Sequence, residues 1–170
     1  MKRTLLVMGF WLFNVQSLMA FTLSSPQFQP NGPIPRVYTC QGANVSPPLS
    51  WQDPPYETQS YALVLSDLDT QKQLGFTLIH WVLFDINGKL GSLNANTMQG
   101  KRGMNGEAHV SYDGPCPPAG MGPHRYVFQL YALDVPVLEL GQGASLDDVD
   151  KIIQEHVIDT AQLVGTYEYQ

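Results

Sequence analysis

Three segments rich in β-branched and aromatic residues constrain the fold of this chain most strongly. Each carries apolar side chains on both faces, and they span residues 61–67, 76–86 and 125–133. A strand with two apolar faces is typical of the centre of a sheet that is covered on both sides. Asn87-Gly88 after the second segment is a strong turn signal, and residues 21–23 and 49–51 indicate shorter outer strands.

One helix and one further strand complete the predicted fold. Apolar residues recur on one face of residues 146–156, Ser145 can cap that helix, and Asp147 and Asp148 suit its positive end. A last strand is expected over residues 162–169, whereas residues 31–55 are dense in Gly, Pro and Asn and are interpreted mainly as ordered loop. The chain shows no internal repeat. We therefore predict one mainly β domain with one or two peripheral α-helices.

The first 20 residues have the pattern of a secretory signal peptide. Lys2 and Arg3 precede a nearly continuous apolar run over residues 5–13, and polar residues then lead to Ala20. The run is shorter than the roughly 20 residues that a membrane span needs. Cleavage after Ala20, or alternatively after Ser17, leaves a mature domain of about residues 21–170. The predicted location is periplasmic or secreted. Because the junction has no cysteine, a stable lipid anchor to the membrane is not expected.

The charge of the chain argues against a nucleic-acid partner. The sequence has 9 Lys and Arg against 15 Asp and Glu, and the signal segment contains two of the basic residues and no acid. Seven basic residues against 15 acids leave the mature domain at about −8, without the basic stripe that phosphate backbones require. A small anion is still compatible with this charge, because a few local donors can hold it.

Cys40 and Cys116 are the two cysteines of the chain. They can form one disulfide or remain two buried free thiols, and export favours the disulfide because oxidising compartments preserve it. Closing a loop of about 76 residues stabilises the fold by roughly 4 kcal/mol in the chain-entropy description.

Polar residues near the ends of the predicted central strands are the candidates for a site. The even-numbered residues of 76–84 share a face in a regular strand, which would place His80 in line with Phe76, Leu78, Val82 and Phe84. Asp67 and Asp69 lie where one strand ends, and His124 and Tyr126 share a face where another begins. We hypothesise that Asp67, His80, His124 and Tyr126 converge, although a lone histidine in an apolar row is more often structural.

The segment before His124 contains four prolines and three glycines within residues 114–123. Such a loop is stiff and allows close backbone approach. Its amides could line a concavity that binds anions, or the segment could be a rigid strand connector. Composition does not separate these two interpretations.

Three stretches of this chain resemble the phosphatidylethanolamine-binding protein family, also called Raf kinase inhibitor-like proteins, and its bacterial branch in particular. Residues 114–128 resemble the second signature of the family. Ser66-Asp67-Leu68-Asp69 followed by Ile79-His80-Trp81-Val82 resembles the first signature, and residues 40–51 resemble the N-terminal segment of bacterial members. With the ending at residues 160–169, the similarity spans nearly the whole mature chain.

The resemblance implies a fold of two antiparallel β-sheets with peripheral helices and a small anion pocket at one end. By motif position, Asp67, His80, His124 and Tyr126 would line that pocket, and Asp69, Gly114 and Pro115 would form its rim. Arg125 matches the motif but should face away and pair with an acid or cap carbonyl groups. One departure is that the family usually reads Asp-Pro-Asp-Ala-Pro where this chain has Asp67-Leu68-Asp69-Thr70-Gln71. Both acids are kept but both prolines are missing, so we expect a less rigid rim.

The expected function is that of a non-enzymatic binding protein for a phosphate-like or carboxylate group, such as a phosphoethanolamine-like head group. Inhibition or modulation of a partner enzyme is a further expectation, and no cofactor or metal is expected. The alternative is a hydrolase or metalloenzyme that uses the Asp and His cluster. The sequence contains neither a Gly-x-Ser-x-Gly motif nor a short His or Cys metal-binding spacing, which favours the binding protein.

Overall fold

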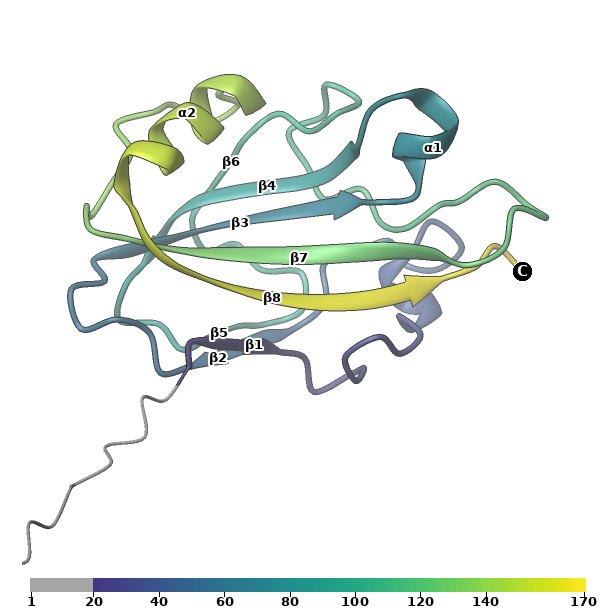
Figure 1. Cartoon of the computed structure of the whole chain (residues 1–170), viewed down its shortest axis with the longest axis horizontal. Coiled ribbons are helices and arrows are strands. Elements are labelled where there is room, and N and C mark those ends of the chain that lie inside the picture. The colour runs from purple at the N-terminus through teal and green to yellow at the C-terminus, as the bar shows by residue number, and fades with distance from the viewer. Residues whose placement is uncertain (1–19) are drawn as a thin grey trace, which may run out of the picture.

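The three predicted central strands lie side by side in one antiparallel sheet. The computed structural model describes residues 20–170, so the predicted signal peptide lies almost wholly outside the described residues. The sheet has the order β6-β4-β3-β7-β8 (Figure 1). Its strands are β3 (Ser60–Asp67), β4 (Leu78–Asn87), β6 (Lys101–Arg102), β7 (His124–Leu133) and β8 (Val157–Tyr167).

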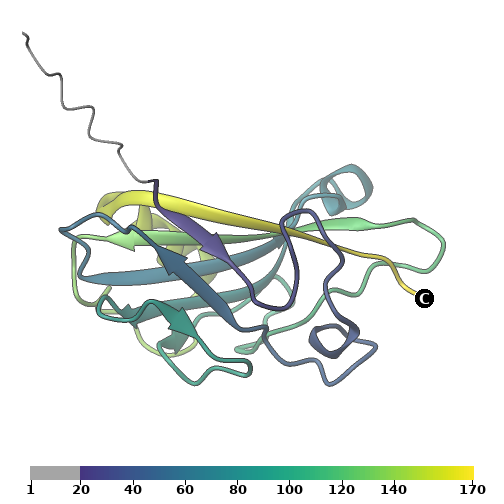
Figure 2. The same cartoon turned by 90° about the horizontal axis from the view of Figure 1, so that it is seen from below.

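A small antiparallel sheet covers one face of the large sheet. It consists of β1 (Thr22–Ser24), β2 (Leu49–Gln52) and β5 (Ser92–Leu93), in the order β1-β2-β5. Leu23, Trp51 and Leu93 of this sheet belong to one buried cluster with Leu63 and Phe128 of the large sheet. Figure 2 shows the small sheet in front of the large sheet, with the 3-10 turn η1 (Arg36–Tyr38) beyond the end of the small sheet. The predicted mainly β, two-sheet fold is confirmed.

Helix α2 (Leu146–His156) covers part of the opposite face (Figure 1) and has the predicted bounds. Its apolar side chains Val149 and Ile153 are buried against Val82 and Phe84 of β4. Ser145 Oγ accepts a hydrogen bond from the Asp148 amide at 3.1 Å, which satisfies one free amide of the first turn. No helix within residues 20–170 is long and apolar enough to cross a membrane.

The ends of two predicted strands were wrong. β4 begins at Leu78 instead of residue 76, because helix α1 (Thr70–Leu74) precedes it and ends at Gly75 with a φ of 81°. Phe76 therefore lies outside the strand and is exposed. β8 begins directly after α2, five residues before the predicted start, and ends at Tyr167. Its first half is an exposed sheet edge, so the sequence there lacks the apolar alternation of a buried strand.

The expected row of His80 with Val82 and Phe84 was also wrong. Leu65 pairs with Trp81 and Ser66 with Ile79, so β4 carries one extra residue, His80, at a β-bulge. Val82 and Phe84 face α2, whereas Trp81 packs between the two sheets. The bulge turns His80 to the face that carries Tyr126 of β7.

Candidate functional site

The four residues predicted to converge lie at one end of the large sheet. Asp67 ends β3, His124 begins β7, and Tyr126 stands opposite Asp67 in the register of these strands. His80 lies near the start of β4, on the other side of β3. Because neighbouring strands are antiparallel, the end of β3 and the starts of β4 and β7 lie at the same end of the sheet. Figure 1 shows α1 and the loop before β7 at this end of the sheet.

Asp67 and His124 form a buried pair. The Asp67 Oδ2 to His124 Nδ1 distance is 2.7 Å, and each side chain is 2% exposed. Asp67 Oδ1 accepts a second hydrogen bond from the Asp69 amide at 2.8 Å. A carboxylate oxygen only accepts, so Nδ1 of His124 carries a proton and Nε2 is left for another partner. That partner is the side-chain amide of Gln73 in α1, at 3.0 Å.

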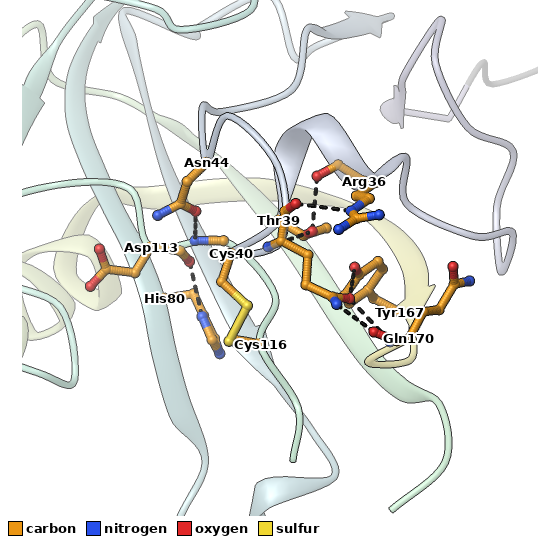
Figure 3. Close-up of a disulfide and its surroundings, with 11 residues drawn as sticks. Arg36, Thr39, Cys40, Asn44, His80, Asp113, Cys116, Tyr167 and Gln170 are labelled. Carbon is orange, nitrogen blue, oxygen red and sulfur yellow. Dashed lines mark hydrogen bonds between the residues drawn. A yellow bond between two sulfur atoms is a disulfide. The ribbon is translucent and has the colours of Figure 1, made fainter. Parts of the chain in front are cut away.

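His80 presents one unpartnered ring nitrogen. Its Nδ1 donates to the main-chain carbonyl of Asp113 at 2.9 Å (Figure 3), while Nε2 is buried without a hydrogen-bond partner among residues 20–170. Burial lowers the pKa of His80, which opposes the smaller effects of the Asp113 carbonyl and nearby acids. A neutral His80 with its proton on Nδ1 offers Nε2 as a lone-pair acceptor.

The hydroxyl of Tyr126 is the second unpartnered group. It is buried without a hydrogen-bond partner in the described part of the chain, and the Tyr126 ring stands edge-on to the His80 ring at 5.4 Å between centroids. Burial, and then the charge of Asp67, raise the pKa of Tyr126 well above its usual range. The phenol therefore stays protonated near neutral pH and remains a hydrogen-bond donor.

A small cavity of about 170 Å³ lies between β7, α1 and the loop before β7. Its lining residues are Asp67, Thr70, Gln73, Leu74, Leu78, His80, Cys116, Pro117, Pro118 and His124. A neighbouring hollow of about 330 Å³ shares Leu78, His80 and Cys116 with it and adds Gly114 and Asp113. A larger hollow of about 470 Å³ beside α2 contains none of the predicted site residues.

The predicted disulfide is confirmed and forms part of the cavity wall. Cys40 and Cys116 are bonded, with 5.5 Å between their Cα atoms, and Figure 3 shows the bridge beside His80. The Cys40 amide donates to the Pro115 carbonyl at 3.2 Å. Pro115 itself is buried and lines neither hollow. The bridge ties the loop before β7 to the loop that follows η1.

Gly114 provides the close backbone approach that its sequence context indicated. A Cβ atom there would lie 2.5 Å from the Tyr38 carbonyl oxygen and 2.5 Å from Asn44 Oδ1. The Gly114 amide donates to Asn44 Oδ1 at 2.8 Å, so this amide is already used within the protein. The Gly114 amide therefore holds the proline-rich segment in place and is not free to donate a hydrogen bond to an anion.

Asp69 faces away from the cavity. Its two carboxylate oxygens accept hydrogen bonds from Arg125 Nη2 at 2.8 Å and Nε at 3.0 Å, so Arg125 pairs with an acid as predicted. The Arg125 guanidinium lowers the pKa of Asp69 to about 2. Asp69 is not among the residues that line either hollow, which places it behind the predicted rim.

Sequence reasoning missed the contribution of α1. The segment expected to be a less rigid loop rim instead forms one helical turn, and Gln73 and Leu74 of that turn line the cavity. Five residues are too short for helical periodicity to show in a sequence. The loss of the two family prolines was not such a signal, because residue 71 lies in the first turn of α1, where proline is tolerated.

The C-terminal tyrosines lie outside the cavity. Tyr167 is buried in the core between the sheets, and Tyr169 is 41% exposed. A separate group of possible metal ligands, Glu107, His109 and Asp113, has atoms within 4.8 Å of one another. His109 Nδ1 donates to Asp113 Oδ2 at 2.7 Å, and this exposed ion pair accounts for the grouping.

Comparison with known proteins identifies relatives along nearly the whole described chain. The sequence profile of the family named "Phosphatidylethanolamine-binding protein" matches residues 24–168. A UPF0098 protein of Methanothermobacter thermautotrophicus is 41% identical over 152 residues, which cover 85% of this chain and 97% of that protein. A UPF0098 protein of Aquifex aeolicus is 36% identical over 169 residues, which cover 96% of both chains.

Two solved structures share the fold. A phosphatidylethanolamine-binding protein homologue from Chlamydia trachomatis superimposes with a TM-score of 0.82 at 36% identity, covering 89% of this chain and 99% of its own. The E. coli protein YbcL, described as a member of the mammalian family, also has a TM-score of 0.82, at 24% identity, with 89% of this chain and 100% of its own covered. The second likeness shows the fold alone.

Proposed function

The chain belongs to the phosphatidylethanolamine-binding protein family, and on this premise we propose that it is an exported binding protein for a small phosphate-like or carboxylate anion. The ligand would sit in the cavity between α1, the start of β7 and the disulfide-tied loop. The cavity volume of about 170 Å³ suits a head group or a free oxyanion better than a large molecule.

The observation that carries this proposal is the pair of buried, unpartnered polar atoms, His80 Nε2 and Tyr126 Oη. Buried polar groups in proteins nearly always have a partner, because an unmade hydrogen bond costs about 1–3 kcal/mol. His80 lines the cavity, whereas Tyr126, which was predicted to line it, is fully buried and lines neither hollow. Because the two rings are neighbours, a ligand that bonds to both groups best explains why neither has a partner.

The chemistry of these groups favours an oxyanion that can carry a proton. The phenol of Tyr126 is a donor for an anionic oxygen, and neutral His80 can accept the proton of a phosphate O–H group. Protonated His80 would instead donate to the anion. The Asp67 carboxylate repels an anion, but both its oxygens already accept hydrogen bonds and its partner His124 can hold a compensating positive charge. Binding should therefore be accompanied by proton uptake and be tighter at pH 6 than at pH 8.

The local contacts favour binding over nucleophilic catalysis. Thr70 is the hydroxyl-bearing residue that lines the cavity, and its Oγ1 both donates to the Asp67 carbonyl and accepts from the Leu78 amide. Both cysteines are in the disulfide, so neither provides a thiolate. A disulfide is also compatible with the oxidising compartment that the signal-like N-terminal sequence predicts.

Replacing Tyr126 with Phe tests the proposal by removing a single hydroxyl. Tyr126→Phe should weaken inorganic phosphate binding in calorimetry by about tenfold, the usual effect of one hydrogen bond to a charged group. Its stability should be unchanged or higher, because the lost hydroxyl has no partner in the protein. Tyr131→Phe is the matched control, because Tyr131 lies on the same strand but packs on the α2 side of the sheet, whereas Tyr126 packs between the two sheets.

Equal phosphate affinity in the wild type and Tyr126→Phe would contradict the proposed site. Turnover of a generic phosphate or acyl ester that depends on His124 would instead favour the hydrolase. The same protein preparation serves both assays.

A further inference from the structure

We infer that Gln73 is an internal competitor for the anion, a residue that occupies His124 in the empty site and sets which ligands can displace it. This inference rests on the proposed anion-binding function. It concerns a side chain on α1 that belongs to neither of the sequence signatures.

The geometry makes the competition direct. His124 has two ring nitrogens, and Asp67 takes Nδ1 at 2.7 Å. Gln73 Nε2 lies 3.0 Å from the remaining nitrogen, Nε2. Gln73 and His124 both line the small cavity. An anion oxygen that bonds to His124 must therefore take the position that the Gln73 amide holds.

The helix that carries Gln73 is fixed, so the movement needed is that of one side chain. At its start, Asp69 is paired with Arg125, and Thr70 Oγ1 bridges the Asp67 carbonyl and the Leu78 amide. At its end, the Gln71 side chain donates to the Gly75 carbonyl at 2.9 Å. None of these contacts involves Gln73.

The side chain has an open path away from His124. Residues 71–76 are all exposed, and Leu74 beside it is 54% exposed. A rotation of the Gln73 side chain would place its amide in water, where its hydrogen bonds are replaced. Displacement therefore costs little beyond the hydrogen bond to His124.

This exchange discriminates by charge. A hydrogen bond between two neutral groups is roughly half as strong as one to an ionised group. An oxyanion bonded to protonated His124 would replace the neutral hydrogen bond from Gln73 with a stronger, charge-assisted one. A neutral amide or alcohol would only replace one neutral hydrogen bond with another. Gln73 thus favours charged oxyanions over neutral polar ligands of the same size.

The test is calorimetric titration of inorganic phosphate into the mature, oxidised protein and three single variants. Gln73→Ala removes the competitor and should bind phosphate about fivefold more tightly, the factor that corresponds to about 1 kcal/mol for one neutral hydrogen bond. Gln73→Glu places a permanent carboxylate at His124 and should bind phosphate at least fivefold more weakly. Gln52→Ala removes an exposed side-chain amide from β2 in the small sheet, outside the cavity, and should match the wild type.

The outcomes separate this inference from the proposed function. Wild-type binding with unchanged or weaker affinity in Gln73→Ala would overturn the competitor role and leave the anion site in place. Weaker binding would identify the amide as a ligand contact instead. No phosphate binding by the wild type or any variant would overturn the anion site and, with it, the competitor.

Discussion

The ring of His80 stands edge-on to the ring of Tyr126 with 5.4 Å between centroids, because one extra residue in β4 turns His80 away from the α2 side of the sheet. The contact brings together two buried polar atoms that have no partner among residues 20–170. A regular strand would have buried His80 in the apolar layer with Val82 and Phe84. The bulge is therefore the backbone feature that places His80 in the site.

His80 should make the protein less stable as the pH falls. Burial lowers its pKa below the ordinary 6.5, so the unfolded chain binds a proton more readily than the folded protein. Stability is fully present above pH 6.5 and is lost below it, by at most about 1.4 kcal/mol per pH unit for this group. Urea unfolding of the wild type and His80→Gln between pH 8 and pH 5 measures this loss. Identical pH slopes would contradict a depressed pKa.

The contribution of the Asp69–Arg125 pair should also be lost as the pH falls, but in a more acidic range than that of His80. The pKa of Asp69 is lowered to about 2 from 3.8, so its contribution is present above pH 3.8 and disappears as the pH falls towards 2. Arg125 is about half exposed, so solvent screening limits the expected effect of Asp69→Asn to about 0.5–1 kcal/mol at pH 7. Chemical unfolding at pH 7 and pH 2 provides the comparison. A deficit that persists at pH 2 would assign the effect to packing rather than to charge.

The disulfide should stabilise the fold and the cavity wall together. It closes a sequence separation of 76 residues, for which chain entropy gives roughly 4 kcal/mol, and native disulfides typically contribute about 2–5 kcal/mol. We expect the Cys40→Ala, Cys116→Ala double variant to lose about 2–4 kcal/mol in urea unfolding and also to bind phosphate more weakly. A variant that loses stability but keeps full affinity would show that the tether does not shape the site.

Gly114 should tolerate no side chain. Alanine there would place Cβ 2.5 Å from a main-chain oxygen of Tyr38, which cannot rotate away. We expect Gly114→Ala to cost about 1–3 kcal/mol, the range for forced overpacking. Gly141→Ala is the matched control, because a Cβ at that position meets nothing within 4 Å. Equal thermal stability of the two variants would contradict the close approach.

The sequence predicted those parts of the fold that depend on long patterns. The strands β3, β4 and β7 and the helix α2 are long enough for burial on their faces to appear as periodicity. The pairing of Cys40 with Cys116 followed from there being only two cysteines and from the predicted export.

The missed features depend on single residues or on tertiary contacts. A β-bulge at His80 adds one residue without changing the apolar composition of the strand, so periodicity places its side chain on the wrong face. Helix α1 has a single turn, and its Gln73 acquires a role only because β7 brings His124 beside it. The start of β8 lacks apolar alternation because residues 158–160 are exposed in succession, so neither face of the strand is buried there.

The ring-nitrogen resonances of the four histidines during a phosphate titration test the central claim most directly. In ¹⁵N-labelled mature protein at pH 7, the Nε2 resonances of His80 and His124 should both shift and saturate at the same phosphate concentration, because each nitrogen gains a hydrogen bond to the anion. The exposed His109 and the half-exposed His156 lie outside the small cavity and should not change, which makes them internal controls. No change at His80 and His124, or equal changes in all four rings, would contradict an anion site built on these two residues.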